Sequence, residues 1–150
     1  MLAEHALPAD IDARLTALAT AWGDDPSIAA VYLFGSRAAG SAGPRSDVDL
    51  AVVLDGALDD EARWRKRLDL IGDATQRLGT DAVDVVVLEQ APSVLGQRVL
   101  SRGRLIAERD AWRRTRVAEQ VMRRYLDEAY LRAVLDAGLS RRIREGRFAG

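Results

Sequence analysis

Two aspartates separated by one residue are the strongest chemical signal in the sequence. Asp47 and Asp49 stand at the start of an apolar run that ends at Leu54. In a β-strand, residues two apart project from one face, with Cα atoms roughly 6.5–7 Å apart. Two carboxylates at that range repel by about 2.4 kcal/mol at an effective dielectric near 20. The pattern indicates either two exposed aspartates at a strand start or a pair of oxygen ligands for a divalent cation such as Mg²⁺.

A glycine-serine pair precedes the two aspartates. Gly35-Ser36 follows an apolar run over 28–34, and ten residues separate Ser36 from Asp47. Glycine allows backbone N–H groups to approach a phosphate closely, and the serine hydroxyl adds a donor. Arginines in the same segment would offset phosphate charge, and an ordinary loop between two strands is the alternative interpretation. The candidate nucleotide-binding residues are Gly35, Ser36, Arg37, Arg45 and Ser46.

A third aspartate interrupts a later valine-rich run. Asp84 lies within residues 83–88, where strand alternation places it on the face opposite to most of the valines. A lone carboxylate in such a strand is costly unless it is paired or binds a metal. We therefore expect Asp84 to join Asp47 and Asp49 in one metal site. Asp81 stands just before the strand, and we expect it to lie outside the site.

Together these motifs resemble the nucleotidyltransferase superfamily of the DNA polymerase β type. The resemblance is carried by Gly-Ser, ten residues, Asp-x-Asp and a later strand aspartate. The small size and the segment 34–54 are similar to the minimal nucleotidyltransferases (MNT proteins), whose MntA-type antitoxins pair with HEPN-domain toxins of the HepT kind. Residues 83–88, residues 103–106 and Tyr125 also fit the general pattern, so the resemblance covers most of the chain.

The resemblance implies an α+β nucleotidyltransferase fold that transfers AMP from ATP to a tyrosine hydroxyl of a cognate HEPN toxin, blocking its RNase activity. It implies that Asp47 and Asp49 hold two Mg²⁺ ions. Asp84 would hold the catalytic ion and help to deprotonate the attacking hydroxyl, and Gly35 and Ser36 would bind the β- and γ-phosphates. The implied partners are ATP and the HepT-like toxin, with no membrane and no direct nucleic-acid binding.

Two other functions remain open at this point. A small-molecule adenylyltransferase of the aminoglycoside type would need an acidic substrate cleft, and acidic residues are plentiful over 55–61. A non-catalytic module that masks the toxin sterically would not need the three aspartates, all of which are present.

Missing residue types exclude several further chemistries. The chain has no cysteine and one histidine, His5, which removes Cys/His zinc sites, thiol nucleophiles and histidine-based triads. It has neither a P-loop nor a Gly-x-Gly-x-x-Gly motif. The HEPN ribonuclease signature needs a histidine downstream of an arginine, so the RNase of such a pair would be the partner. The lack of cysteine, of a membrane-length apolar run and of a secretion signal favours a reducing, cytoplasmic setting.

Charge is distributed unevenly along the 150 residues. The net charge is −1, but residues 1–97 carry 16 acids against 8 bases, and residues 98–150 carry 7 acids against 14 bases. The C-terminal part is therefore basic. This composition is typical either of a solvated helical surface or of a surface that docks an anionic partner.

Hydrophobic periodicity predicts one domain over 1–150, with a small mixed β-sheet flanked by helices. We expect a core over about 10–108, a C-terminal helical segment over about 110–140 and a polar tail over 141–150. The expected strands are 28–34, 48–54, 83–88 and a short edge strand at 105–107. The expected helices are marked by Ile11, Leu15, Leu18 and Trp22, by Trp64, Leu68, Ile71, Thr75 and Leu78, by the run 92–100, and by Val117, Val121, Tyr125 and Ala129.

The three tryptophans, Trp22, Trp64 and Trp112, fall on helical stripes or helix starts. We expect them in the hydrophobic core rather than on a base-stacking surface. The basic tail is expected either to be solvated or to dock a partner, and His5 is assigned no role.

Overall fold

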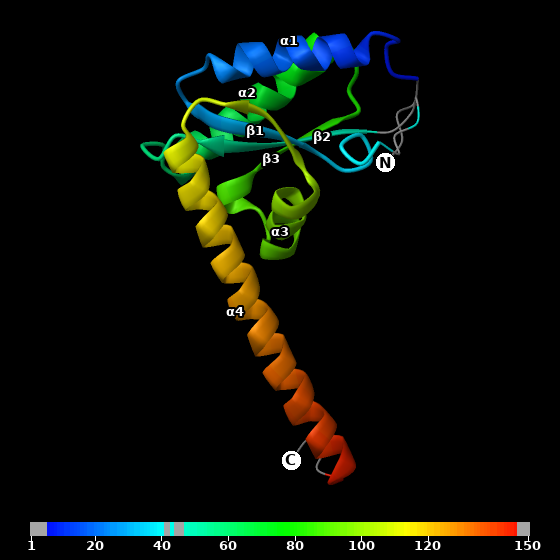
Figure 1. The fold of residues 1–150 in the computed structure, drawn as a ribbon, viewed down its shortest axis with the longest axis vertical. Coiled ribbons are helices and arrows are strands. Elements are labelled where there is room, and N and C mark those ends of the chain that lie inside the picture. The colour runs from blue at the N-terminus through cyan, green and yellow to red at the C-terminus, as the bar shows by residue number, and fades with distance from the viewer. Residues whose placement is uncertain (1–5, 41–42, 44–46, 147–150) are drawn as a thin grey trace.

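Two seven-residue apolar runs form the centre of the β-sheet (Figure 1). β1 (Ile28–Phe34) and β2 (Val48–Leu54) pair antiparallel. β3 (Val83–Val87) runs parallel to β2, and β4 (Arg104–Glu108) pairs antiparallel with β1, giving the order β3-β2-β1-β4. The predicted mixed sheet and its edge strand are confirmed.

The computed structural model describes residues 6–40, 43 and 47–146 of the chain. Helices cover both faces of its sheet, with α1 and α2 on one side and α3 and the start of α4 on the other (Figure 1). The expected α+β architecture, a small mixed sheet flanked by helices, is confirmed. The helices are α1 (Ile11–Gly23), α2 (Asp60–Leu78), the short 3₁₀ helix η1 (Leu88–Gln90), α3 (Ser93–Arg102) and α4 (Ala111–Arg144).

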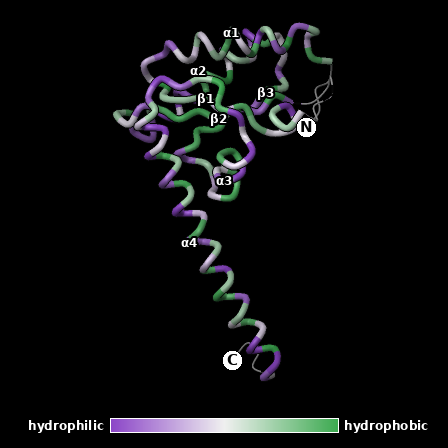
Figure 2. Tube along the Cα trace, viewed as in Figure 1, coloured by the Kyte–Doolittle hydropathy of each residue, from purple (hydrophilic) through white to green (hydrophobic). Residues whose placement is uncertain are grey.

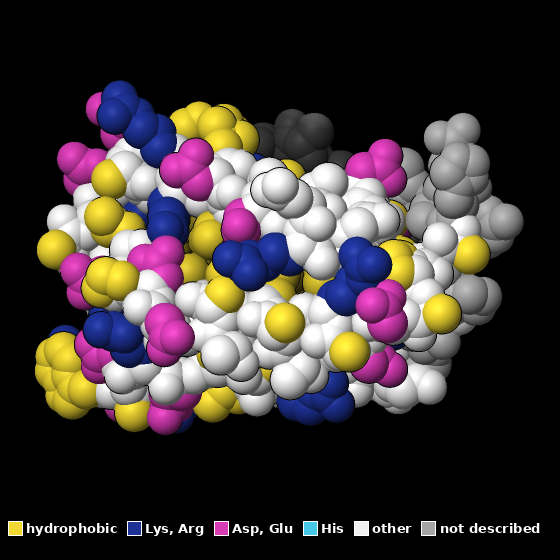
Figure 3. Space-filling model, turned by 90° about the horizontal axis from the view of Figure 1, so that it is seen from above, with side chains coloured by type: hydrophobic (Ala, Val, Ile, Leu, Met, Phe, Trp, Pro, Cys, Tyr) yellow, Lys and Arg dark blue, Asp and Glu magenta, His cyan; other side chains and the backbone are white. Residues whose placement is uncertain are grey.

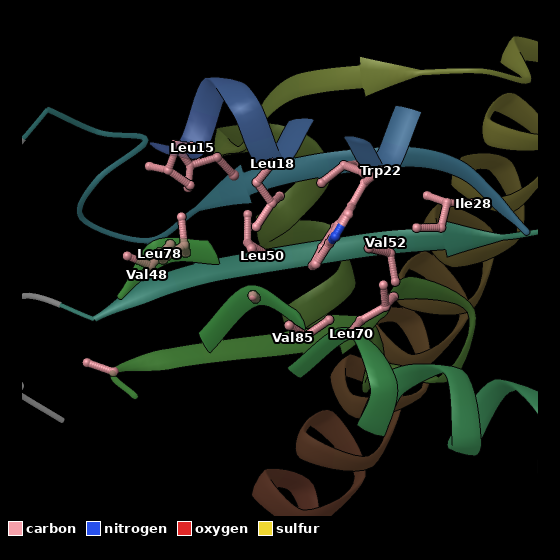
Figure 4. Packing of buried hydrophobic residues seen from close by; sticks show 14 of the residues in the cluster. Leu15, Leu18, Trp22, Ile28, Val48, Leu50, Val52, Leu70, Leu78 and Val85 are labelled. Carbon is pink, nitrogen blue, oxygen red and sulfur yellow. The ribbon is translucent and has the colours of Figure 1, made fainter. Parts of the chain in front are cut away.

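The two faces of β2 bury different clusters because its side chains alternate. Leu50 and Val52 point into the larger cluster, beneath α1 and α2, where Leu18 and Trp22 of α1 meet them (Figure 4). The Trp22 indole nitrogen also donates a hydrogen bond to Asp73 Oδ2 of α2 at 2.7 Å. Residues 51 and 53 point to the other face and pack beneath α3 and α4. Asp49, which alternates in the same way as residues 51 and 53, therefore projects toward the α3/α4 face.

The first part of α4 is fixed to the sheet by polar and close apolar contacts. Arg113 Nε donates to the Leu54 carbonyl at 3.1 Å, while the Leu54 N–H donates to Glu89 Oε2 at 2.9 Å. A Cβ on Gly96 of α3 would lie 2.6 Å from Val121 Cγ1, so α3 and α4 approach as closely as a glycine allows.

The prediction of which side chains of α2 are buried is partly wrong. Trp64 and Leu68 are 53% and 48% exposed, and the buried side chains of this helix are Leu70, Ala74 and Leu78. Arg67 lies over the Trp64 ring, with its Cζ 5.8 Å from the ring centroid, so an exposed cation–π contact accommodates the indole. Helical periodicity correctly predicts the helix. The large apolar residues beside its buried face make the sequence pattern point to the wrong set of buried side chains.

Trp112 is also outside the core, contrary to the prediction. It lies in the first turn of α4, is 71% exposed and stacks near Arg116, whose Cζ is 5.3 Å from the ring centroid. Of the three tryptophans only Trp22 is buried.

The end of α4 lies beyond the expected boundary. The tail was predicted to begin at residue 141, but the helix continues to Arg144. Arginine is a good helix former, and the cations of Arg141, Arg142 and Arg144 interact favourably with the C-terminal end of the helix dipole. Although α4 has 34 residues, no helix in the described part of the chain is long and apolar enough to cross a membrane.

Substitutions in α2 test the corrected phase. Leu70→Ala should lower the free energy of unfolding by about 2–5 kcal/mol, because it leaves a cavity beneath the sheet. Leu68→Ala, the matched control, should cost less than about 1 kcal/mol because half of that side chain is already exposed. Urea denaturation followed by far-UV circular dichroism measures both. Equal losses, or a larger loss for Leu68→Ala, would contradict the observed orientation of α2.

Candidate functional site

Strand pairing brings the predicted aspartates to one end of the sheet. Asp49 of β2 pairs in register with Asp84 of the parallel strand β3, and it lies opposite Phe34 at the end of β1. Neighbouring residues in register project from the same face. Asp47 precedes β2 and shares the parity of Asp49. Two carboxylates on adjacent strands and a third just before β2 therefore lie at one end of the sheet, where Gly35 follows β1.

The pKa of Asp49 reflects its burial and the two carboxylates beside it. Partial burial raises the pKa of the Asp49 carboxyl above its ordinary value, and the negative charges of Asp84 and Asp47 raise that pKa further. A cation near Asp49 would relieve both effects. Carboxylate oxygens on one face are also the donor type that Mg²⁺ prefers, so the donor set fits the predicted metal.

Asp84 has a partner that the sequence did not predict. Arg67 of α2 places Nη2 3.6 Å from Asp84 Oδ1, and its Nε donates to the Val85 carbonyl at 2.7 Å. Arg67 is therefore held against the outer edge of β3, where it offsets part of the negative charge. Nothing in the sequence distinguishes this arginine from the other charged residues of α2, so only the folded structure reveals its position.

The carboxylates lie together on one face without forming a closed ligand cage. Across residues 6–40, 43 and 47–146, no group of three or more His, Cys, Asp or Glu side chains is arranged to hold a metal ion. The Asp84 side chain is 57% exposed and oriented toward Arg67. A three-carboxylate metal site therefore requires the Asp84 side chain to rotate away from Arg67.

Gly35 makes the closest approach in the site. Its φ of +74° is a left-handed conformation that favours glycine, and a Cβ there would lie 2.3 Å from Asp49 Oδ2. The following residues form a single turn, in which the Ala39 N–H donates to the Gly35 carbonyl at 3.2 Å. Ser36 lies in this turn and is partly buried. The predicted Gly-Ser pair is thus adjacent to the predicted Asp-x-Asp pair.

Arg37 lies on the other side of the sheet from the aspartates. Its Nη1 is 3.3 Å from Asp12 Oδ1 of α1, and its side chain lines a pocket of about 570 Å³ together with Arg104 of β4. Seen from the α1 side, charged side chains of both signs are interspersed over the surface (Figure 3). The structure does not bring Arg37 to the carboxylates. Arg45 and Ser46, the other predicted phosphate contacts, lie outside the described residues.

Comparison with known families identifies this arrangement. Residues 18–111, which include both motifs and all four strands, match the family described as polymerase beta nucleotidyltransferase. The chain belongs to this family. The nucleotidyltransferase family predicted from the Gly-Ser and Asp-x-Asp motifs is confirmed.

Individual relatives within the family are also similar to this chain. The protein adenylyltransferase MntA of Shewanella oneidensis is 38% identical over 79 residues, a match that spans 53% of this chain and 53% of that relative. A crystal structure of a toxin–antitoxin with AMP-PNP matches with 28% identity and a TM-score of 0.60, over 84% of this chain and 98% of that one. A chain from the tri-AMPylated Shewanella oneidensis HEPN toxin in complex with an MNT antitoxin matches with 26% identity and a TM-score of 0.56, over 86% of this chain and 96% of that one.

Two glycines in the same turn provide a matched test of the Gly35–Asp49 contact. Gly35→Ala should abolish nucleotidyl transfer, because the new Cβ displaces the Asp49 carboxylate. Gly40→Ala should retain transfer, because Gly40 has almost the same φ, +75°, but nothing lies within 4 Å of its Cβ position. Each variant should lose about 1–2 kcal/mol of stability from backbone strain. Denaturation and initial-rate assays measure the two effects, and equal activity in both variants would contradict the proposed contact.

The raised pKa of Asp49 predicts a pH dependence of stability. Because the folded-state pKa exceeds the unfolded-state value, Asp49 contributes stability below the unfolded value that is lost as pH rises through the folded value. At neutral pH without divalent cations, Asp49→Asn should therefore be more stable than the wild type, by about 1 kcal/mol. Thermal denaturation across a pH series measures the difference. A difference that shrinks as pH rises would contradict the direction assigned to this carboxyl.

Proposed function

We propose that the chain is an antitoxin that transfers AMP from ATP to a tyrosine hydroxyl of a cognate HEPN-domain, HepT-like RNase toxin and so neutralises it. The observation that carries the proposal is the in-register pair of Asp49 and Asp84, next to Asp47 and the Gly35-Ser36 turn. The similarity to MntA and to MntA-type toxin–antitoxin complexes supports the choice of a protein acceptor.

The reaction requires alignment of phosphates and neutralisation of charge. The acceptor oxygen forms a bond to the α-phosphorus of ATP, the bond from that phosphorus to the bridging oxygen breaks, and pyrophosphate leaves. When bound, two Mg²⁺ ions would supply the positive charge that this transfer needs. Asp47 and Asp49 would hold both ions, and Asp84 would hold the catalytic one.

The remaining roles fall to residues around the carboxylates. Asp84 would also receive the hydroxyl proton, which its exposed position permits once its oxygens leave Arg67. Gly35 and Ser36 would bind the β- and γ-phosphates through the turn that follows β1. Arg37, Arg45 and Ser46 remain predicted phosphate contacts, and Arg37 would have to leave Asp12 to act as one.

A double substitution tests the function directly. Asp47→Asn with Asp49→Asn should abolish AMP transfer to the purified toxin while leaving the fold intact, because the amides keep the shape but lose the charge. Asp81→Asn is the matched control, since Asp81 is exposed and lies just before β3, outside the carboxylate group. Intact-mass spectrometry of the toxin after incubation with ATP and Mg²⁺ measures transfer.

The same measurement separates the alternative functions. Addition of AMP by the wild type and Asp81→Asn, but not by the double variant, supports the proposal. An unmodified toxin that is nonetheless inhibited by the wild type would indicate steric masking. An unmodified toxin together with adenylylation of an aminoglycoside would indicate a small-molecule enzyme. Undiminished labelling by the double variant would refute the assigned site.

A further inference from the structure

The distal half of α4 carries an apolar stripe that packs on nothing in the described chain. Val117 and Val121 are the buried residues of this helix, and both face the sheet side of the domain. Leu135 and Leu139 each lie 18 residues further on, about five turns, so they fall on the same helical face. Beyond the domain this face is uncovered. Its aliphatic members are Leu131, Leu135, Leu139 and Ile143, which are 49–62% exposed.

The shape of the molecule makes this stripe accessible. α4 extends away from the sheet, and its last turns lie far from every other element (Figure 1). Apolar and polar residues alternate along this extension (Figure 2). A long helix gains most of its stability from packing an amphipathic face, and contiguous exposed apolar patches mark interaction surfaces. The stripe therefore indicates a contact that the isolated chain does not supply.

We propose that this stripe pairs with the same stripe of a second copy of the chain, as an antiparallel helix pair centred on Leu135. A two-fold axis at Leu135 sets Leu131 of one copy against Leu139 of the other, so the surface is complementary to itself. The absence of a large side chain at Gly138 allows the two helices to approach closely there.

Charge complementarity selects the antiparallel arrangement. Glu128 and Arg142 both lie on the stripe, and each is seven residues from Leu135. Glu128 Oε2 accepts a hydrogen bond from the Ser93 hydroxyl of α3, so its carboxylate is held at the edge of α3. An antiparallel pair therefore places Arg142 of each copy opposite Glu128 of the other. A parallel pair would place Arg142 against Arg142 and Glu128 against Glu128, which is repulsive. The same dyad brings Arg132 of one copy near Asp136 of the other.

The fold leaves room for this pairing. With Leu135 at the centre, Arg144 at the helix end reaches the axial level of residue 126 in the other copy. The paired segments, 126–144, are about 28 Å long at 1.5 Å per residue. The end of each helix then reaches the level of Glu128 in the other copy, where Ser93 at the start of α3 contacts α4.

Sedimentation equilibrium of the full chain without toxin tests the proposal. The wild type should be dimeric, and Leu135→Asp should raise the dissociation constant by about 100-fold or more, because a carboxylate would be buried against its symmetry mate. Leu126→Asp is the matched control. Leu126 is nine residues, or two and a half turns, from Leu135, so it lies on the opposite face and its substitution should leave the dimer intact.

A charge exchange tests the direction of the pairing. Arg142→Glu should weaken the dimer about tenfold, and adding Glu128→Arg should restore it, with unchanged far-UV circular dichroism in every variant. An unchanged dissociation constant in Arg142→Glu would overturn the antiparallel arrangement, because a parallel pair would only exchange the Arg142–Arg142 repulsion for a Glu–Glu repulsion. A monomeric wild type, or an equally tight dimer in Leu135→Asp, would overturn the proposal. A monomeric wild type whose toxin binding is lost in Leu135→Asp would assign the stripe to the toxin instead.

Discussion

Repulsion between carboxylates gathered at one end of the sheet is the constraint on which the proposed site depends. The pairing of β2 with β3 sets Asp49 beside Asp84, and the alternation of β2 puts Asp47 on the same side. The fold holds these charges at the partly buried edge of a hydrophobic sheet, where the pKa of Asp49 rises. Such an arrangement lowers stability unless positive charge arrives, and in this chain Arg67 supplies some of it at Asp84.

The sequence predicted the parts of this arrangement that are set by local pattern. β1 and β2 begin and end where the apolar runs do. The predicted site rested on aspartates within or next to the apolar strands, namely Asp47 before β2, Asp49 in β2 and Asp84 in β3. Gly35 was predicted to permit a close approach, and it does so, although the atom that it admits in this structure is a carboxylate oxygen of Asp49.

The parts that could not be predicted depend on how elements face one another. The prediction of which face of α2 is buried was wrong because Trp64 and Leu68 are as apolar as core residues. Only the position of the sheet shows that these two side chains face outward. Arg67 and Arg37 illustrate the same limit. The sequence analysis assigned Arg37 to the site and gave Arg67 no role, whereas tertiary packing sets Arg67 beside Asp84 and ties Arg37 to Asp12 of α1.

The most direct test of the central claim is the thermal stability of the chain as Mg²⁺ is titrated in the presence of a non-hydrolysable ATP analogue. A ligand that binds only the folded state raises the melting temperature, and it does so increasingly as the free ligand concentration exceeds the dissociation constant. The wild type should be stabilised progressively by Mg²⁺ with the analogue, and a variant with asparagine at 47 and 49 should not respond. Equal stabilisation of the two proteins would show that the aspartates do not form the cation and nucleotide site.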